Sequence, residues 1–267
     1  MKRRRSNPVR FRRPAGFTLI ELLVVMAIIS ILLAVTLPVL HKVRVIAYRA
    51  RCASQLKQIA TAWQAYLVDS DQQFYQGEMA NHYFGGGKGL VGGVVFRPLN
   101  KYVGLPTEPN SRIGTELFRC PADKGDPDYG PSAYRYFGNS YETNLMLIGV
   151  GWLRTTLPEP TGGLHRAINE RLENLKADAI CDPTRLLLVG DNNWVKQWEP
   201  WLPTPDRAWH GVQGRYNLAF FDCHVAFIEI HKGIYLDSDY RVQPFKELDD
   251  LTLDAQSQIV EALSAGT

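Results

Sequence analysis

The chain has 267 residues, of which 45% are hydrophobic and 21% are charged, so it is long enough to bury one sizeable core. The formal net charge of +3 is unevenly distributed, because seven positive charges and no acidic residue precede residue 16. Removing those seven from the 30 basic residues leaves 23 against 27 acidic ones. A mildly acidic body argues against a nucleic-acid-binding surface.

An apolar run from Phe17 to Leu40 follows this basic leader and contains one charged residue, Glu21. As an α-helix the run would be roughly 36 Å long, enough to cross the hydrocarbon core of a bilayer. A secretory signal has a shorter apolar region with small residues after it, so a membrane anchor is favoured over a cleaved signal peptide or a buried core helix. The leading charges predict a cytoplasmic N-terminus.

The helical pattern continues beyond the apolar run. Pro38 should bend the helix rather than end it, since apolar positions resume directly after it. One continuous helix is therefore expected from Phe17 to about Ser70. Its second half has apolar residues at the spacings of one helix face: Val45, Cys52, Leu56, Ile59, Trp63, Tyr66 and Leu67.

The remainder is predicted to be a loop-rich head with an antiparallel sheet, which makes the fold α+β. We expect helices within residues 161–180 and 254–263, a strand over 182–191, and a hairpin over 216–230 with its turn at Asp222–Cys223. The expected organisation is a leader (1–16), a transmembrane half-helix (17–40), a soluble half-helix (41–75) and a globular head (76–267).

The motif GFTLIE at residues 16–21, between a basic leader and a long apolar run, resembles the prepilin signature of type IV pilins and type II secretion pseudopilins. The resemblance implies a lollipop-shaped membrane protein whose leader is removed by prepilin peptidase. Cleavage would fall between Gly16 and Phe17, followed by methylation of the Phe17 amine. It also implies assembly with other pilin-like subunits.

Glu21 is the unusual residue of the apolar run, because an acidic group deep in a bilayer costs a few kcal/mol and usually marks function. By the same resemblance, Glu21 would face the Phe17 amine of a neighbouring subunit during assembly and fix the register between helices. The alternative is a glutamate that only reaches the membrane surface near the helix start.

The downstream blocks FRCPADKG, SYETN, DPTRLLLVGD and WHGVQGRYNLAFFDCHVAF resemble a branch of pilin-like proteins with a processing-associated domain. That domain is named for a His and an Asp-Gly pair nine residues apart. Here eleven residues separate His210 from Asp222, and Cys223 stands in place of the glycine. No role of that motif is therefore transferred to these residues.

Metal binding has two sets of candidate residues. His210, Asp222, His224 and Asp191 are of types that bind metals, but their spacing is not diagnostic and a turn already explains Asp222. Some pseudopilins bind calcium through acidic loops, and the acidic loop here carries Asp123, Asp126 and Asp128. A solvated loop is favoured, and no cofactor is predicted.

Four cysteines, an even number, fall in the part predicted to be exported, where disulfides persist. A bridge from Cys52 to Cys120 would fasten a loop to the long helix. Four separate buried thiols are the alternative, and the sequence does not determine the connectivity.

The favoured function is a membrane-anchored structural subunit, not an enzyme, that polymerises through its N-terminal helix into a pilus or secretion pseudopilus. Its head is expected in the periplasm or outside the cell. One alternative is a membrane-anchored, metal-dependent hydrolase that uses His210, Asp222 and His224. Another is a surface protein whose aromatic loops bind carbohydrate or a solid substratum.

Overall fold

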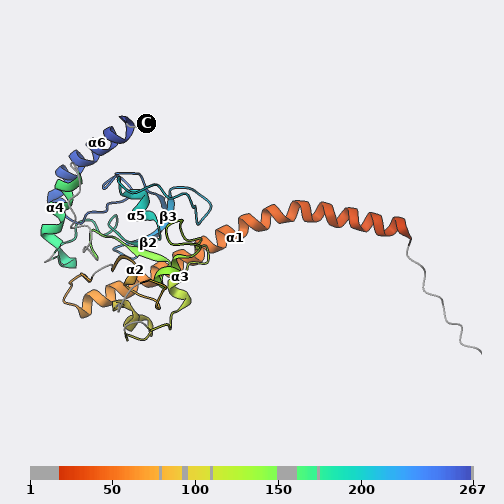
Figure 1. Ribbon diagram of the computed structural model, residues 1–267, viewed down its shortest axis with the longest axis horizontal. Coiled ribbons are helices and arrows are strands. Elements are labelled where there is room, and N and C mark those ends of the chain that lie inside the picture. The colour runs from red at the N-terminus through yellow and green to blue at the C-terminus, as the bar shows by residue number, and fades with distance from the viewer. Residues whose placement is uncertain are drawn as a thin grey trace, which may run out of the picture. The chain divides into compact units, whose positions relative to one another are not determined.

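The computed structural model describes residues 18–77, 80–91, 96–108, 111–148, 161–172 and 175–265 (Figure 1). Two predicted processing residues, Gly16 and Phe17, lie outside the described residues, as does the leader. The chain forms two compact units, one ending at Arg44 and one running from Val45 to the C-terminus.

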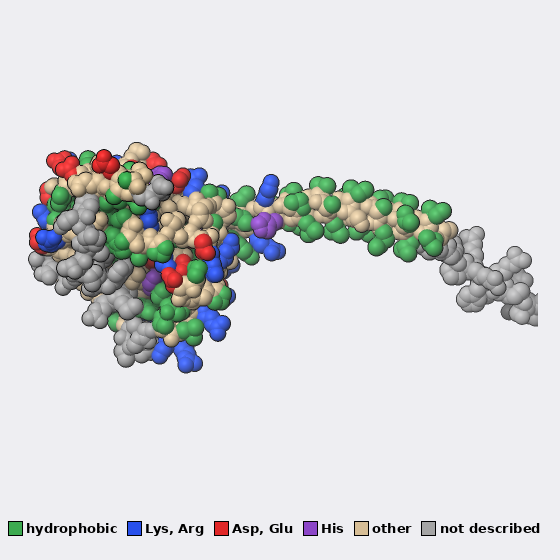
Figure 2. Space-filling model, turned by 45° about the horizontal axis from the view of Figure 1, so that its top comes forward, with side chains coloured by type: hydrophobic (Ala, Val, Ile, Leu, Met, Phe, Trp, Pro, Cys, Tyr) green, Lys and Arg blue, Asp and Glu red, His purple; other side chains and the backbone are tan. Residues whose placement is uncertain are grey.

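Helix α1 (Leu19–Asp69) is 51 residues long and continues through Pro38, so the prediction of one continuous helix is confirmed. Its apolar side chains before Arg44 are exposed, for example Leu19 at 80% and Ile31 at 65%, and Figure 2 shows them covering the helix surface. Within the described residues, α1 is long and apolar enough to cross a membrane, and none of its most apolar window is buried. So large an exposed apolar surface requires lipid or a protein partner.

The second half of α1 contributes one face to the core of the head. The predicted apolar face is largely correct, although Val45 and Tyr66 are only partly buried. The face also includes a polar residue, Gln55, that the apolar pattern did not reveal. Its buried residues are Cys52, Gln55, Leu56, Ile59, Ala60, Ala62, Trp63 and Leu67.

A four-stranded antiparallel sheet forms the centre of the head, with the strands in chain order. Every residue of the second strand is buried, including the acidic Asp191 at its end. The predicted hairpin is confirmed, and Cys223 in its turn adopts a φ of 69°, where glycine would be less strained. The strands are β1 (Tyr141–Thr143), β2 (Leu187–Asp191), β3 (Arg215–Phe220) and β4 (Val225–Glu229).

Short helices occupy much of the remaining head. The helix predicted within residues 161–180 ends at Leu172, and the C-terminal one begins at Asp249, earlier than expected, because two aspartates in its first turn favour the helix dipole. The α-helices are α2 (Ala80–Tyr83), α3 (Ala133–Phe137), α4 (Thr161–Leu172), α5 (Trp194–Trp198) and α6 (Asp249–Ala265). The 3-10 helices are η1 (Pro98–Val103), η2 (Glu116–Phe118), η4 (Ala177–Ala179) and η5 (Lys246–Leu248).

A fragment that begins at Val45 should fold alone and stay monomeric in dilute solution. The buried core described here starts at Cys52, so the fragment keeps all of it and loses only the exposed apolar half of α1. Thermal unfolding and analytical ultracentrifugation are the measurements. A non-cooperative transition, or a tight oligomer at micromolar concentration, would contradict the expectation.

Candidate functional site

The first turn of α1 carries a reciprocal capping arrangement. The backbone N–H and the hydroxyl of Thr18 donate to Glu21 Oε2 at 2.8 and 2.7 Å, and the Glu21 N–H donates to Thr18 Oγ1 at 3.2 Å. This is a capping box, in which the residue before the helix and the third helical residue satisfy each other's backbone donors. The spacing Thr-x-x-Glu is the sequence signal of this cap.

Glu21 therefore has a role within its own chain. Its carboxylate satisfies helix donors that would otherwise be without a partner in an apolar environment. The carboxylate retains lone pairs that can accept further bonds, since an ionised carboxylate has about four acceptor positions. Capping and pairing with a neighbour's amine are therefore compatible.

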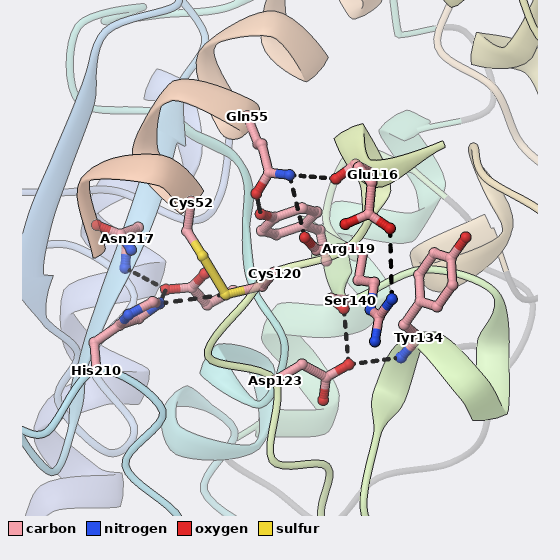
Figure 3. Close-up of a disulfide and its surroundings, with 12 residues drawn as sticks. Cys52, Gln55, Glu116, Arg119, Cys120, Asp123, Tyr134, Ser140, His210 and Asn217 are labelled. Carbon is pink, nitrogen blue, oxygen red and sulfur yellow. Dashed lines mark hydrogen bonds and ion pairs between the residues drawn. A yellow bond between two sulfur atoms is a disulfide. The ribbon is translucent and has the colours of Figure 1, made fainter. Parts of the chain in front are cut away.

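A disulfide joins Cys52 of α1 to Cys120 in the loop after η2, with the two Cα atoms 5.4 Å apart (Figure 3). The linked residues are 68 positions apart in sequence, and both are fully buried. One turn along α1, the amide of Gln55 donates to the carbonyls of Glu116 in η2 and of Arg119 directly after it. The loop is thus attached to α1 by both covalent and hydrogen bonds.

His210 and Asp191 lie beside this disulfide. His210 Nε2 is 3.0 Å from Asp191 Oδ2 and 3.7 Å from Cys120 Sγ, and the Asp191 and His210 side chains are each 1% exposed. The N–H of Asn217 in β3 donates to the same Asp191 oxygen at 2.8 Å (Figure 3). Burial, together with the charge of Asp191, raises the pKa of Tyr141 well above its usual value. These contacts place a carboxylate, an imidazole and two sulfurs in one dry cluster.

The hydrolase set of His210, Asp222 and His224 is not brought together, so this expectation was wrong. Asp222 and His224 pair with each other at 2.6 Å in the β3–β4 turn, where their side chains are 34% and 46% exposed. His210 is buried in the loop before β3. Among the described residues, the one group of three or more potential ligands is Cys52, Cys120, Asp191 and His210.

The acidic loop that carries Asp123, Asp126 and Asp128 is held by protein donors. Asp123 accepts bonds from three backbone N–H groups and from the hydroxyls of Ser132 and Ser140. Lys196 bonds both other aspartates, and its hydrogen bond lowers the pKa of Asp128. Each carboxylate is therefore already compensated, which favours a structural loop over a calcium site.

The other two cysteines, Cys181 and Cys223, are free and partly buried. Burial raises the pKa of both thiols. A raised pKa disfavours the reactive thiolate, so neither has the character of an activated nucleophile.

Comparison with known proteins agrees with the N-terminal geometry. Residues 11–37 match the family model described as the prokaryotic N-terminal methylation motif. The chain is also 42% identical over 62 residues to the competence protein ComGC of Halalkalibacterium halodurans. That match covers 23% of this chain and 61% of the relative. Both similarities support a type IV pilin-like chain, and this chain spans less than two thirds of the relative's length. No solved structure matches it.

The family match includes the N-terminal capping box and does not include the disulfide cluster of the head. The family match covers Glu21 and the exposed apolar helix, so the capping box lies inside the matched motif. The disulfide cluster lies outside residues 11–37 and is a property of the head. The membrane anchor is thus supported both by sequence family and by an unburied apolar helix.

Removing the disulfide should destabilise the pilin-like head. In metal-free buffer, the Cys52→Ser/Cys120→Ser variant should lose about 2–4 kcal/mol of unfolding free energy, because a cross-link over so long a loop restricts the unfolded chain. Peptide mapping without reduction tests the bond, and urea unfolding tests its contribution. The control is Cys181→Ser/Cys223→Ser, which should keep the cross-linked peptide. Finding Cys52 and Cys120 as free thiols in air-oxidised protein would refute the pairing.

Proposed function

We propose that this chain is a structural subunit that prepilin peptidase cleaves after Gly16 and that polymerises through α1 into a pilus or pseudopilus. The observation that supports this most strongly is an unburied apolar helix that opens with Thr18 and Glu21 inside a matched methylation motif. A helix of this kind has two possible environments, the bilayer before assembly and neighbouring helices after it.

Charge pairing explains why Glu21 lies in this helix. Cleavage after Gly16 creates a positively charged amine on Phe17, four residues from Glu21. In a bundle of such helices the amine of one subunit pairs with Glu21 of the next, which costs less than burying two isolated charges. A helix displaced by one turn leaves both charges unpaired, so the pair also sets the axial register.

The proposed location follows from the charges and the cysteines. Seven basic residues before the apolar run keep the N-terminus in the cytoplasm, and the head is placed on the opposite side of the membrane. A Cys52–Cys120 disulfide suits that oxidising side.

The two alternatives have less support. A metal-dependent hydrolase would need His210, Asp222 and His224 to form one site, and these residues do not lie together. A protein that binds carbohydrate or a solid substratum would need exposed aromatic residues. Within the described part of the chain Trp63, Trp194, Trp198 and Trp209 are instead buried, and Trp201 is partly buried against the core.

The mature protein should begin at Phe17 with a methylated amine. Intact-mass and N-terminal peptide analysis of protein taken from its native membrane are the measurements. A bulky substitution, Gly16→Leu, should block cleavage, whereas Gly16→Ala should still be cleaved because alanine remains small. Native protein that retains Met1 would contradict the proposal.

Substitution of Glu21 should impair assembly and leave membrane insertion intact. Glu21→Leu removes a costly acidic group from the bilayer, so insertion should not suffer. An unpaired amine in the helix bundle costs roughly 3–5 kcal/mol, and a third of that should lower filament yield about tenfold. Filament yield after shearing, measured at equal membrane content, is the readout.

Two further variants separate pairing from capping. Glu21→Gln keeps a capping-box residue but loses the charge, so it should assemble as poorly as Glu21→Leu if pairing matters. Thr18→Val removes the cap and keeps the charge, and should assemble far better than either. Ser30→Ala is the matched control, since the Ser30 hydroxyl donates to Met26 O of its own helix. Normal filament yield from Glu21→Leu would refute the assembly role.

A further inference from the structure

The buried cluster around the disulfide has the composition of a transition-metal site. Its potential ligand atoms come from Cys52, Cys120, Asp191 and His210, and all lie within 4.8 Å of one another. The four residues belong to α1, the loop after η2, the end of β2 and the loop before β3. The head's tertiary fold, rather than a local sequence motif, brings them together.

The polar members of the cluster are incompletely satisfied. Asp191 Oδ2 has two partners, the Asn217 N–H and His210 Nε2, but Asp191 Oδ1 is buried with no hydrogen-bond partner in the protein. A buried, unpaired polar atom is costly, and such atoms usually have a ligand or a functional reason.

We propose that Cys52, Cys120, His210 and Asp191 bind one zinc ion when the disulfide is reduced. Two thiolates, one imidazole and one carboxylate are ordinary zinc ligands, and four of them complete a closed tetrahedral site. The same two sulfurs form either the disulfide or the zinc site, but not both at once. Either one fastens the Cys120 loop to α1.

The geometry requires only a local adjustment. Zn–S bonds of about 2.3 Å in a tetrahedron place two sulfurs about 3.7 Å apart, so the sulfurs must separate after reduction. The Cα atoms of Cys52 and Cys120 are 5.4 Å apart, and rotation of the side chains can provide this separation. His210 Nε2 already faces Cys120 Sγ at 3.7 Å, the spacing that two ligands of one zinc ion have.

The chemical steps balance with a dithiol as reductant. The dithiol gives two electrons and two protons to the Cys52–Cys120 bond, which becomes two thiols while the dithiol becomes a disulfide. Zn²⁺ then displaces both thiol protons, the His210 ring carries its proton on Nδ1 so that Nε2 offers a lone pair, and Asp191 binds as a carboxylate. Because both cysteines are fully buried, the reductant must act before the head closes or during its opening.

The test compares reduced and oxidised forms of the full chain in detergent micelles. Protein reduced with a dithiol, then freed of reductant and metal without oxygen, should bind one Zn²⁺ per chain. Co²⁺ should show thiolate charge transfer and tetrahedral ligand-field bands. The oxidised protein should show neither. Zinc should slow alkylation of Cys52 and Cys120 at least tenfold, measured by mass spectrometry, and leave Cys181 and Cys223 unprotected.

Variants identify the ligands. His210→Ala and Asp191→Asn should each weaken zinc binding at least tenfold in the reduced chain, and thermal unfolding of their oxidised forms checks the fold. The matched control, Cys181→Ser/Cys223→Ser, should bind zinc as the wild type does. Should the reduced metal-free chain unfold, stoichiometric zinc should restore its cooperative transition. The proposal is overturned if reduced wild-type protein binds no zinc, if zinc leaves Cys52 and Cys120 unprotected, or if the control variant loses binding.

Discussion

The head is built on the face of α1 that is buried between Cys52 and Leu67. Cys52 and Gln55 fasten the loop around Cys120 to this face, and Trp63 fills the core beside Phe84 and Tyr66. Because the helix is continuous to Leu19, the segment that organises the head also carries the membrane-spanning residues. A single helix therefore has to satisfy a protein core over one half and a lipid or helix environment over the other.

Helices and strands of this chain were predictable from sequence where their apolar residues repeat at regular spacing, because such a repeat reflects which side of the element is buried. Apolar residues on one face predicted which side of the second half of α1 packs in the core, and two apolar strands around Asp222–Cys223 predicted the hairpin. The capping box also has a sequence signal, Thr18 and Glu21 three residues apart, which the charge of Glu21 alone does not reveal.

The cluster beside the disulfide was not predictable in the same way. Asp191 and His210 are separated by a helix and an irregular loop, and their contact depends on how β2 and β3 pair. Sequence reasoning instead grouped His210 with Asp222 and His224, which are nearer to one another along the chain. The hairpin turn exposes those two to solvent, whereas the loop before β3 directs His210 to the core.

The proposed role of Glu21 in assembly and the proposed zinc site depend on different conditions, so each can be tested separately. In the proposed assembly, Glu21 pairs with an amine that only cleavage creates, whereas the proposed zinc site depends on the redox state around the head. A subunit synthesised in a reducing cytoplasm and exported to an oxidising compartment meets both conditions in succession. Zinc would then stabilise the Cys120 loop while the thiols are reduced, and the disulfide would replace it after export. The same two sulfurs would keep the loop attached to α1 throughout.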